Sequence, residues 1–330
     1  MASSSPAERV CAMCLVRFPL ARLKLCGGCM KRAYCSKECQ SRDWQATNGG
    51  QGHKNWCKLR CGEESYEWEV TEIPSKGLGL RALSFIPCLS RIMVDGLRTI
   101  NDPVLLTLEP MDGTLTQKIG LNCLGGDTSE DGSYICGRIS RANHNCNPNA
   151  AHFLDETFHV KVLYAERDIQ PGEEICISYT NFTDCSTSMT SDDARMLLAL
   201  KWKIHCSSDC YCFEPEVVDL AQRAKYLDAE IQAVASTSPD TTKALKLIRE
   251  LLSIHERLPS SQVSKMRTFY DGFQISITRR NTIMASKTFI EAAYDINSHI
   301  LFPKSEKLNQ MRLYLENPSK DRNYLIRESY

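Results

Sequence analysis

Apolar residues in the middle of the chain follow the short period of β-strands. Residues 158–164 (FHVKVLY) carry an apolar side chain at every second position, which predicts a strand with one buried face. A Pro-Gly turn separates it from residues 175–179 (ICISY), which predict a second strand that ends in a tyrosine. Because Gly and Pro interrupt the apolar runs throughout residues 68–180, this region is predicted to consist of short strands.

The last third of the chain follows a helical period instead. Residues 217–234 and 241–258 carry apolar side chains at spacings of three and four, which predicts two amphipathic helices. Residues 266–280 and 284–301 predict two more helices, separated by polar breaks. Successive pairs of helices suggest an all-α, TPR-like domain at residues 213–330, although no clean repeat signature of about 34 residues is present.

Composition and length are those of a globular protein. Hydrophobic residues make up 42% and charged residues 24% of 330 residues, enough for two or three domains. No run of about 18 apolar residues exists, so we expect no transmembrane helix and no membrane partner. Residues 1–10 lack the apolar segment of a signal peptide and are predicted to be disordered. We therefore expect the protein in the nucleus and/or the cytoplasm.

Charge is unevenly distributed, although the formal net charge is zero. Residues 9–60 contain 11 Lys/Arg against 2 Asp/Glu, a net charge of +9. Residues 61–212 contain 12 against 22, a net charge of −10, and residues 213–330 contain 17 against 15, or +2. An acidic middle third favours a basic partner or substrate, although a solvated acidic surface would have the same composition.

The 17 cysteines indicate either disulfides or metal sites. Disulfide frameworks belong to small secreted chains, whereas nuclear and cytosolic chains use clustered cysteines to bind zinc. Eight residues of the ligand type lie within 47 residues, and in chain order they are Cys11, Cys14, Cys26, Cys29, Cys35, Cys39, His53 and Cys57. Eight such ligands complete two tetrahedral zinc sites. A segment this short buries little apolar surface, so the metal is expected to supply much of its folding free energy.

This block resembles the MYND zinc finger, through the eight ligands and the sequence YCSKECQSRDW at residues 34–44. The gap between Trp44 and His53 is longer than is usual in that family. MYND modules usually bind proteins, often proline-rich segments, so a proline-rich protein is the expected partner, while the basic charge leaves DNA as an alternative. The resemblance implies two interleaved sites, one formed by Cys11, Cys14, Cys35 and Cys39, the other by Cys26, Cys29, His53 and Cys57.

Three further motifs follow in a fixed order: KGLGL at 76–80, NHNCNPN at 143–149 and GEEICISY at 172–179. Each is weak alone, since a Gly-x-Gly also occurs in a plain strand-turn-strand and a tyrosine at a strand end is usually a core residue. Together they resemble the SET-domain lysine methyltransferases, over about residues 68–212. Asn145 departs from that family, which usually has serine at this position.

The resemblance implies the domain organisation. A MYND finger at 11–57 precedes a β-rich SET domain at 68–184, whose C-terminal segment is expected to thread a loop. A cysteine-rich post-SET segment at 185–212 and the helical domain at 213–330 follow. The predicted fold class is therefore α+β, in the arrangement of fungal-type, SMYD-like proteins with an N-terminal MYND finger.

A third group of cysteines lies in WKIHCSSDCYC at residues 202–212, with three thiolates where a structural zinc site needs four ligands. The resemblance implies that Cys146 of the NHNC motif completes the site. The spacing Cys-x3-Cys-x-Cys differs from the family's Cys-x-Cys-x2-Cys, and His205 is an alternative ligand. The predicted third zinc ligands are Cys146, Cys206, Cys210 and Cys212, which makes three structural zinc ions in total.

The resemblance also implies a site for S-adenosylmethionine. Tyr179 is expected to point its hydroxyl at the methyl-transfer point and to orient the lysine amine. Alignment is the expected role and not proton removal, because a phenol with an unperturbed pKa near 10 is a poor base at pH 7. Trp202 is expected to stack on the adenine or to line the lysine channel, with a core position as the alternative. The remaining contacts are the backbone of Lys76, Gly77 and Leu78, the side chain of Asn143 at the amino-acid end, and the backbone of His144 at the adenine.

These features predict methyl transfer from S-adenosylmethionine to lysine side chains of basic proteins, either histone tails or others. A non-catalytic MYND/SET scaffold that acts in transcriptional regulation is the alternative. The presence of Tyr179, Asn143 and the Gly-x-Gly argues against it. A third hypothesis, a DNA-binding zinc protein, is supported only by the basic charge of the first block. The helical domain would cover one side of the substrate cleft, bind a partner, or serve only as a stabilising extension.

Overall fold

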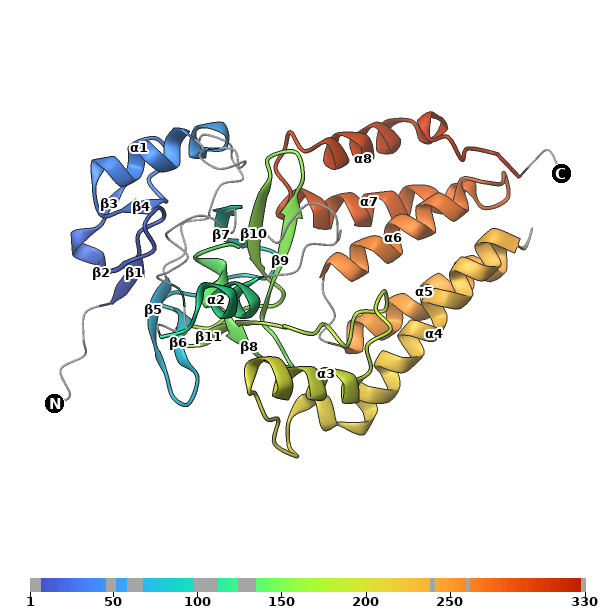
Figure 1. Ribbon diagram of the computed structural model, residues 1–330. Coiled ribbons are helices and arrows are strands. Elements are labelled where there is room, and N and C mark those ends of the chain that lie inside the picture. Colours follow the sequence, from blue (N-terminus) through green and yellow to red (C-terminus); the bar gives the residue numbers. More distant parts are fainter. Residues whose placement is uncertain are drawn as a thin grey trace. The chain divides into compact units, whose positions relative to one another are not determined.

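The computed structural model divides the chain into two compact units, Met1–Tyr179 and Thr180–Tyr330. The first unit contains the block of zinc ligands and the β-rich region, and the second is helical (Figure 1). None of the helices in the described residues could span a lipid bilayer. The structure describes residues 7–45, 52–57, 68–97, 108, 112–123, 135–237, 241–258 and 262–327.

Short elements build the block of zinc ligands. Strand β1 (Glu8–Val10) pairs antiparallel with β2 (Arg17–Pro19). Residues 8–10 were expected to belong to a disordered N-terminus, but they form β1, and Val10 is buried in the core of the β-rich region. The other elements are η1 (Leu20–Arg22), β3 (Lys24–Leu25), β4 (Ala33–Tyr34), α1 (Lys37–Gln45) and η2 (His53–Asn55).

Two sheets form the β-rich region, as the strand pattern predicts. The strand order is β5-β6-β11-β8 in one sheet and β7-β10-β9 in the other. Strands β11 and β8 pair in parallel, whereas the remaining pairs are antiparallel. The strands are β5 (Trp68–Ile73), β6 (Gly77–Ala82), β7 (Arg91–Gly96), β8 (Asn143–His144), β9 (Ala150–Asp155), β10 (Val160–Ala165) and β11 (Glu174–Ile177).

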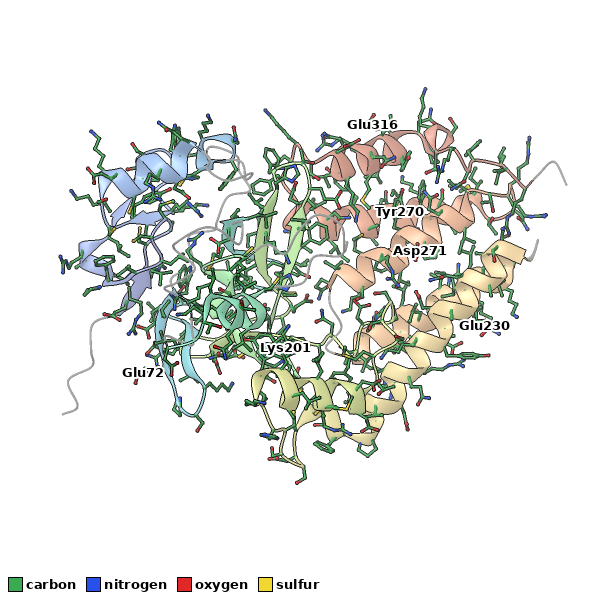
Figure 2. The ribbon with its side chains drawn as sticks, in the orientation of Figure 1. Glu72, Lys201, Glu230, Tyr270, Asp271 and Glu316 are labelled. Carbon is green, nitrogen blue, oxygen red and sulfur yellow. The ribbon has the colours of Figure 1, made fainter. Side chains whose placement is uncertain are left out.

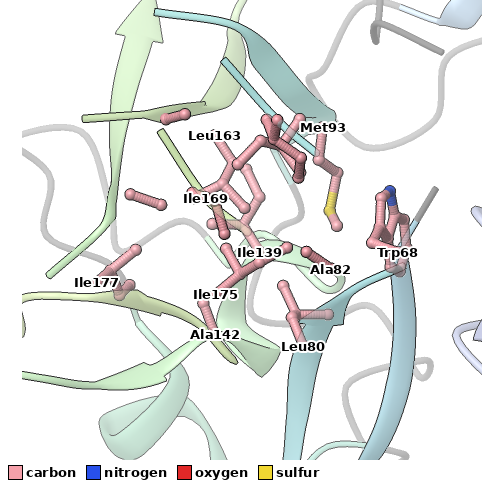
Figure 3. Close-up of a cluster of buried hydrophobic side chains, with 14 of the residues drawn as sticks. Trp68, Leu80, Ala82, Met93, Ile139, Ala142, Leu163, Ile169, Ile175 and Ile177 are labelled. Carbon is pink, nitrogen blue, oxygen red and sulfur yellow. The ribbon is translucent and has the colours of Figure 1, made fainter. Parts of the chain in front are cut away.

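Both sheets contribute side chains to one apolar core (Figure 3). Trp68, Leu80 and Ile175 come from the four-stranded sheet, and Met93 and Leu163 come from the three-stranded sheet. Alternation along residues 158–164 predicts one buried face, yet every residue of β10 is buried. The prediction was wrong here because β10 is the central strand of its sheet and both of its faces are covered. Helix α2 (Leu115–Asn122) begins with a capping box made by Thr114 and Gln117.

The second unit is a succession of helices. The four helices predicted from the apolar spacing are confirmed, and each contacts the next along the chain, as in a helical array. Helix α8 was not predicted, since FPKSEK reads as a break and only a short apolar pattern follows it. The elements are α3 (Ser191–Leu197), the π-helical turn η5 (Leu198–Trp202), η6 (Tyr211–Phe213), α4 (Pro215–Thr237), α5 (Thr241–Arg257), α6 (Gln262–Ser276), α7 (Ile283–Ile300), α8 (Glu306–Glu316) and η7 (Pro318–Lys320).

Polar and apolar contacts both join these helices. Glu230 of α4 pairs with Lys243 of α5 at 3.3 Å between Oε1 and Nζ (Figure 2). Asp271 of α6, labelled in Figure 2, is half-buried, and this burial raises the pKa of its carboxyl to about 6. Where α6 meets α7, Gly272 packs against the ring of Phe289. A glycine is needed there because the two helices leave no room for a methyl group.

Alanine at Gly272 should therefore destabilise the protein although alanine favours helices. The added Cβ would lie 2.7 Å from Phe289 Cδ1, and such overpacking costs about 1–3 kcal/mol. This cost exceeds the gain in helix propensity of about 1 kcal/mol. Gly120 in α2 is the matched control, because a Cβ there meets nothing within 4 Å. Urea denaturation should show a lower unfolding free energy for Gly272→Ala and an unchanged or higher one for Gly120→Ala. The reverse order would contradict this packing.

Candidate functional site

The structure brings the eight ligands of the first block together in two groups, and within each group the ligand atoms lie within 4.8 Å of one another. In the first group the Sγ atoms of Cys14 and Cys35 are 3.7 Å apart, and those of Cys35 and Cys39 are 3.5 Å apart. Zinc with Zn–S bonds of about 2.3 Å holds tetrahedral sulfurs about 3.8 Å apart. Within the described residues no disulfide joins any cysteine. The groups are Cys11, Cys14, Cys35 and Cys39, and Cys26, Cys29, His53 and Cys57.

The second group includes a histidine whose protonation is determined by its neighbours. His53 Nε2 lies 3.5 Å from Cys29 Sγ, on the side of the ligands. Its Nδ1 lies 2.9 Å from the hydroxyl of Tyr34, which in turn donates to Asp43 Oδ2 at 2.6 Å. Because the tyrosine gives its only proton to the carboxylate, His53 Nδ1 must be the donor to Tyr34. Nε2 is then unprotonated, as a zinc ligand must be.

Asp43 connects this chain of hydrogen bonds to the β-rich region. Arg32 is buried and donates Nε and Nη2 to the two oxygens of Asp43, at 2.6 and 2.9 Å. Its Nη1 donates to the carbonyl oxygen of Val94 in β7, at 2.6 Å. Burial raises the pKa of Asp43, but the charge and hydrogen bonds of Arg32 outweigh it and lower the pKa to about 2. The zinc block is therefore bonded to the core of the first unit.

Replacement of Asp43 by Asn should weaken zinc binding at the second group. Loss of such a partner behind a ligand histidine typically costs 10- to 100-fold in metal affinity. Competition with a chromogenic chelator should show one zinc ion released at a lower chelator concentration than in the wild type. Glu38→Gln is the matched control, because Glu38 lies on the same helix and its side chain is exposed. Equal chelator resistance of Asp43→Asn and Glu38→Gln would contradict the role of Asp43.

The third cysteine group lies in the second unit. The Sγ atoms of Cys210 and Cys212 are 3.5 Å apart, and Arg195 donates to the carbonyl oxygen of Cys212 at 2.7 Å. Cys212 is buried and Cys206 is partly exposed, whereas His205 is exposed. The predicted fourth ligand, Cys146, is buried in the first unit. The three cysteines that are close in sequence therefore have the spacing and burial expected of thiolate ligands.

The segment NHNCNPN lies alongside β11, with Asn143 and His144 in β8 paired to Cys176 and Ile177. Asn149 joins the two segments. Its Nδ2 donates to the carbonyl oxygen of Glu174 at 2.8 Å, and its Oδ1 accepts the backbone N–H of Cys176 at 2.8 Å. A buried amide that satisfies backbone groups of a neighbouring strand fixes the register of that strand.

Asn145, the departure from the family, has a local structural role. Its Oδ1 accepts the backbone N–H of Asn147 at 2.8 Å, which is an Asx turn. A serine hydroxyl can make the same type of turn, so the asparagine can take the structural role of a serine here. The sequence alone assigned no role to Asn147, and its contribution here is this backbone N–H.

The two glycines of KGLGL have different functions. Gly77 has φ +77°, a conformation that side-chain-bearing residues rarely adopt, at the turn between β5 and β6. Gly79 allows a close approach, because a Cβ there would lie 2.6 Å from Asn143 Nδ2 and 3.1 Å from Glu174 Oε1. The Gly-x-Gly motif thus brings the start of β6 against β8 and β11.

His144 is held neutral between two partners. The backbone N–H of Tyr179 donates to its Nδ1 at 3.1 Å, so the proton of the neutral ring is on Nε2. Nε2 lies 3.2 Å from Cys146 Sγ and donates to it. Burial, helped by the charge of Lys76, lowers the pKa of His144 to about 4. The side chain therefore serves as a hydrogen-bond bridge, and not as a base at neutral pH.

Tyr179 lies just beyond the end of β11, with its ring packed against that of His144 at 5.3 Å between centroids. Its hydroxyl donates to the carbonyl oxygen of Ala142 at 2.9 Å. Burial, with contributions from Cys176 and Glu174, raises the pKa of the phenol to about 12. Tyr179 is thus a neutral, oriented phenol. Trp202, the other predicted aromatic, is half-buried in η5 of the second unit, beneath Lys201 Nζ at 4.3 Å from its ring.

Sequence reasoning missed Asp43 and Glu174. Asp43 lies inside the motif used to identify the zinc finger, but neither its spacing nor its type marks it as a partner of His53. Glu174 lies inside GEEICISY, and its carboxylate receives hydrogen bonds from Lys76 Nζ at 2.7 Å and Asn143 Nδ2 at 2.9 Å. The order of the three motifs was the available signal, because each motif supplies one member of this contact.

Comparison with known families matches both parts of the first unit. Residues 77–180 match the SET domain family, and residues 11–57 match the MYND finger family. The observed architecture is accordingly a β-rich SET domain with an N-terminal MYND finger, a cysteine-containing post-SET region and a C-terminal helical region.

Individual relatives cover the chain to different extents. The chain is 26% identical over 282 residues to "Histone-lysine N-methyltransferase set5" of Schizosaccharomyces pombe, covering 77% of this chain and 85% of that protein. It is 34% identical over 87 residues to "Protein-lysine N-trimethyltransferase SMYD5" of Mus musculus, covering 26% of this chain and 19% of that protein. The solved structure of the Neurospora SET-domain protein DIM-5 has 17% identity and a TM-score of 0.28, covering 44% of this chain and 65% of that one. Whole-chain similarity at that TM-score is too low to support a comparison of sites.

Proposed function

We propose that this chain, a SET-domain protein with an N-terminal MYND finger, transfers methyl groups from S-adenosylmethionine to lysine side chains of proteins. The observation that carries the proposal is the assembly of Asn143, His144 and Tyr179 around the parallel contact of β8 and β11. Gly77, at the start of β6, borders open space, because a Cβ there would meet nothing within 4 Å. Relatives named as lysine methyltransferases support the reaction class.

The reaction is an in-line displacement, in which a neutral lysine amine attacks an electron-poor methyl group supplied by the sulfonium of the cofactor. The contribution of the protein is therefore positioning and a suitable local environment. Tyr179 fits this role, because the bond to the carbonyl of Ala142 fixes its hydroxyl and its high pKa keeps the phenol neutral. His144 stays neutral as well, so the amine proton is lost to solvent and not to either side chain.

The acidic middle third supports a basic substrate. Residues 61–212 carry a net charge of −10, which attracts a lysine-rich segment of a protein before it binds. A histone tail fits this description, and so does any other basic protein segment. We place the activity in the nucleus and/or the cytoplasm, where such proteins and reduced zinc thiolates both occur.

The MYND finger would bring a protein partner to the enzyme. Val16, Leu25, Met30 and Trp44 of the finger are exposed, and apolar surface of this kind suits a proline-rich segment better than nucleic acid. The alternative function, a non-catalytic scaffold, would need only this exposed apolar surface of the finger. Turnover by the purified protein separates the two possibilities, because a scaffold binds its partner without transferring a methyl group.

Tyr179→Phe should bind S-adenosylmethionine with nearly the wild-type affinity and lose turnover by about 100-fold, since it removes one oriented hydroxyl from the reacting centre. Calorimetry measures the binding, and release of S-adenosylhomocysteine with a lysine-rich protein substrate measures the turnover. Tyr164→Phe is the matched control, because Tyr164 is a buried tyrosine of the same domain whose hydroxyl bonds Glu166. Undiminished turnover of Tyr179→Phe would reject the assignment of this site.

We also propose that Cys146, Cys206, Cys210 and Cys212 bind a third structural zinc ion. Cys210→Ser should then lower the zinc content by one ion per chain and reduce methyl transfer at the same time, because the post-SET segment loses its anchor. Cys88→Ser is the control, since the thiol of Cys88 donates to the carbonyl oxygen of Glu166, as a serine hydroxyl can also do. Metal analysis by mass spectrometry provides the test, and an unchanged zinc content of Cys210→Ser would reject the third site.

A further inference from the structure

The part of the chain that leads from Tyr179 to helix α3 is held by side chains of the helical unit. Lys225 of α4 donates from Nζ to the carbonyl oxygens of Phe182 and Met189, at 2.5 Å each. These two carbonyls lie at the beginning and the end of residues 182–189, which we call the connecting segment. A single ammonium group therefore joins both ends of this segment to α4.

Two further helices contact the middle of the connecting segment. Arg267 of α6 donates from Nη2 to Cys185 Sγ at 3.4 Å, and the same nitrogen donates to Asp228 Oδ1 of α4 at 2.7 Å. His255 Nε2 of α5 lies 4.0 Å from Cys185 Sγ. Burial raises the pKa of the Cys185 thiol to about 12, so the sulfur stays neutral between these groups. Helices α4, α5 and α6 thus each place a polar side chain against one short segment.

Backbone polar groups explain why the connecting segment needs a cation. A loop that packs against helices removes carbonyl oxygens from water, and each of them then needs a donor. Phe182 is buried, and Lys225 is half-buried. Burial lowers the pKa of Lys225, against the effect of the nearby carboxylate of Asp184. The free energy of desolvating the ammonium group is offset only when both carbonyls are in place, so the contact selects one conformation of the segment.

Both ends of the connecting segment lead to residues of the candidate sites. Phe182 follows Tyr179 by three positions in the chain. At the other end the segment runs directly into Thr190, whose side chain caps the N-terminus of α3. Arg195 of α3 donates to the carbonyl oxygen of Cys212, a member of the third cysteine group, at 2.7 Å. Lys225 therefore holds the backbone that comes after the tyrosine and the backbone that comes before the post-SET cysteines.

We infer that Lys225 is a positioning residue for methyl transfer, and that the helical unit acts on the reaction through the connecting segment. The inference rests on the proposed function and assigns the helical unit a role in it. Lys225 contacts neither cofactor nor substrate in this scheme. It keeps the backbone that follows Tyr179 in one conformation, and an in-line displacement depends on such fixed geometry.

Lys225→Met tests the inference, because it removes both donors and keeps an apolar stem of similar length. Amide hydrogens of residues 183–189 should exchange with deuterium about tenfold faster or more, as expected when a charged hydrogen bond no longer holds them. The kcat should fall by about tenfold and the KM for S-adenosylmethionine should change by less than about twofold, because displaced reacting groups lower turnover and leave cofactor binding intact. Mass spectrometry of peptic peptides measures the exchange.

Two controls separate positioning from stability. Lys243→Met removes a lysine of α5 that pairs with Glu230, so it changes the net charge equally and leaves the connecting segment untouched. Gly272→Ala lowers the unfolding free energy of the same helices by overpacking. Neither control should change the kcat or the exchange of the segment. A purely stabilising role of Lys225 predicts instead that Lys225→Met and Gly272→Ala behave alike.

A second variant reaches the connecting segment from its middle. If Lys225→Met does not fold, Cys185→Ala takes its place, because it releases the segment from α6 and leaves the ion pair between Arg267 and Asp228 intact. It should show the same faster exchange of residues 183–189 and the same lower kcat.

The outcomes distinguish the inference from the proposed function. Wild-type protein without turnover on lysine-containing proteins rejects the proposed function, and the exchange of Lys225→Met still shows whether Lys225 holds the connecting segment. Wild-type turnover with an unchanged kcat in Lys225→Met rejects only the role of Lys225. Faster exchange and a lower kcat in Lys225→Met, with wild-type values in Lys243→Met and Gly272→Ala, support it.

Discussion

The buried guanidinium of Arg32 is the interaction on which the first unit depends. A buried cation is tolerated only when it is paired, and Arg32 donates two N–H groups to Asp43 and one to the carbonyl oxygen of Val94. Asp43 in turn orients Tyr34 and, through it, His53. The hydrogen bonds of Arg32 thereby link the second ligand group to β7, so the MYND finger is bonded to the SET domain as well as being a candidate binding module.

Strand β11 has the corresponding role in the candidate active site. It pairs with β6 on one side and β8 on the other, so the three motifs that are far apart in sequence meet along it. Asn149 fixes the register of β11. Glu174, the first residue of β11, bonds two neighbouring segments, and Tyr179 lies just beyond its last residue. The site is therefore built on rigid backbone, as positioning chemistry requires.

Local spacing predicted the eight ligands of the first block and the helices well, whereas the division of those ligands into two groups came from the resemblance to the MYND finger. Eight ligands in a short segment and apolar residues every three or four positions leave few alternatives. The pattern failed for β10, since alternation shows which residues are apolar but not whether a second layer covers the polar face. It also missed Asp43 and Glu174, because each partners residues brought close only by the fold. The resemblance of three ordered motifs supplied the site that spacing alone did not.

Methyl transfer to protein lysine is the central claim. The most direct test is mass spectrometry of an array of basic peptides after incubation with the protein and isotope-labelled S-adenosylmethionine. Labelled methyl groups should appear on lysine residues only, and peptides in which arginine replaces each lysine should stay unlabelled. Absence of label from every lysine peptide, with protein that holds its full zinc content, would contradict the account.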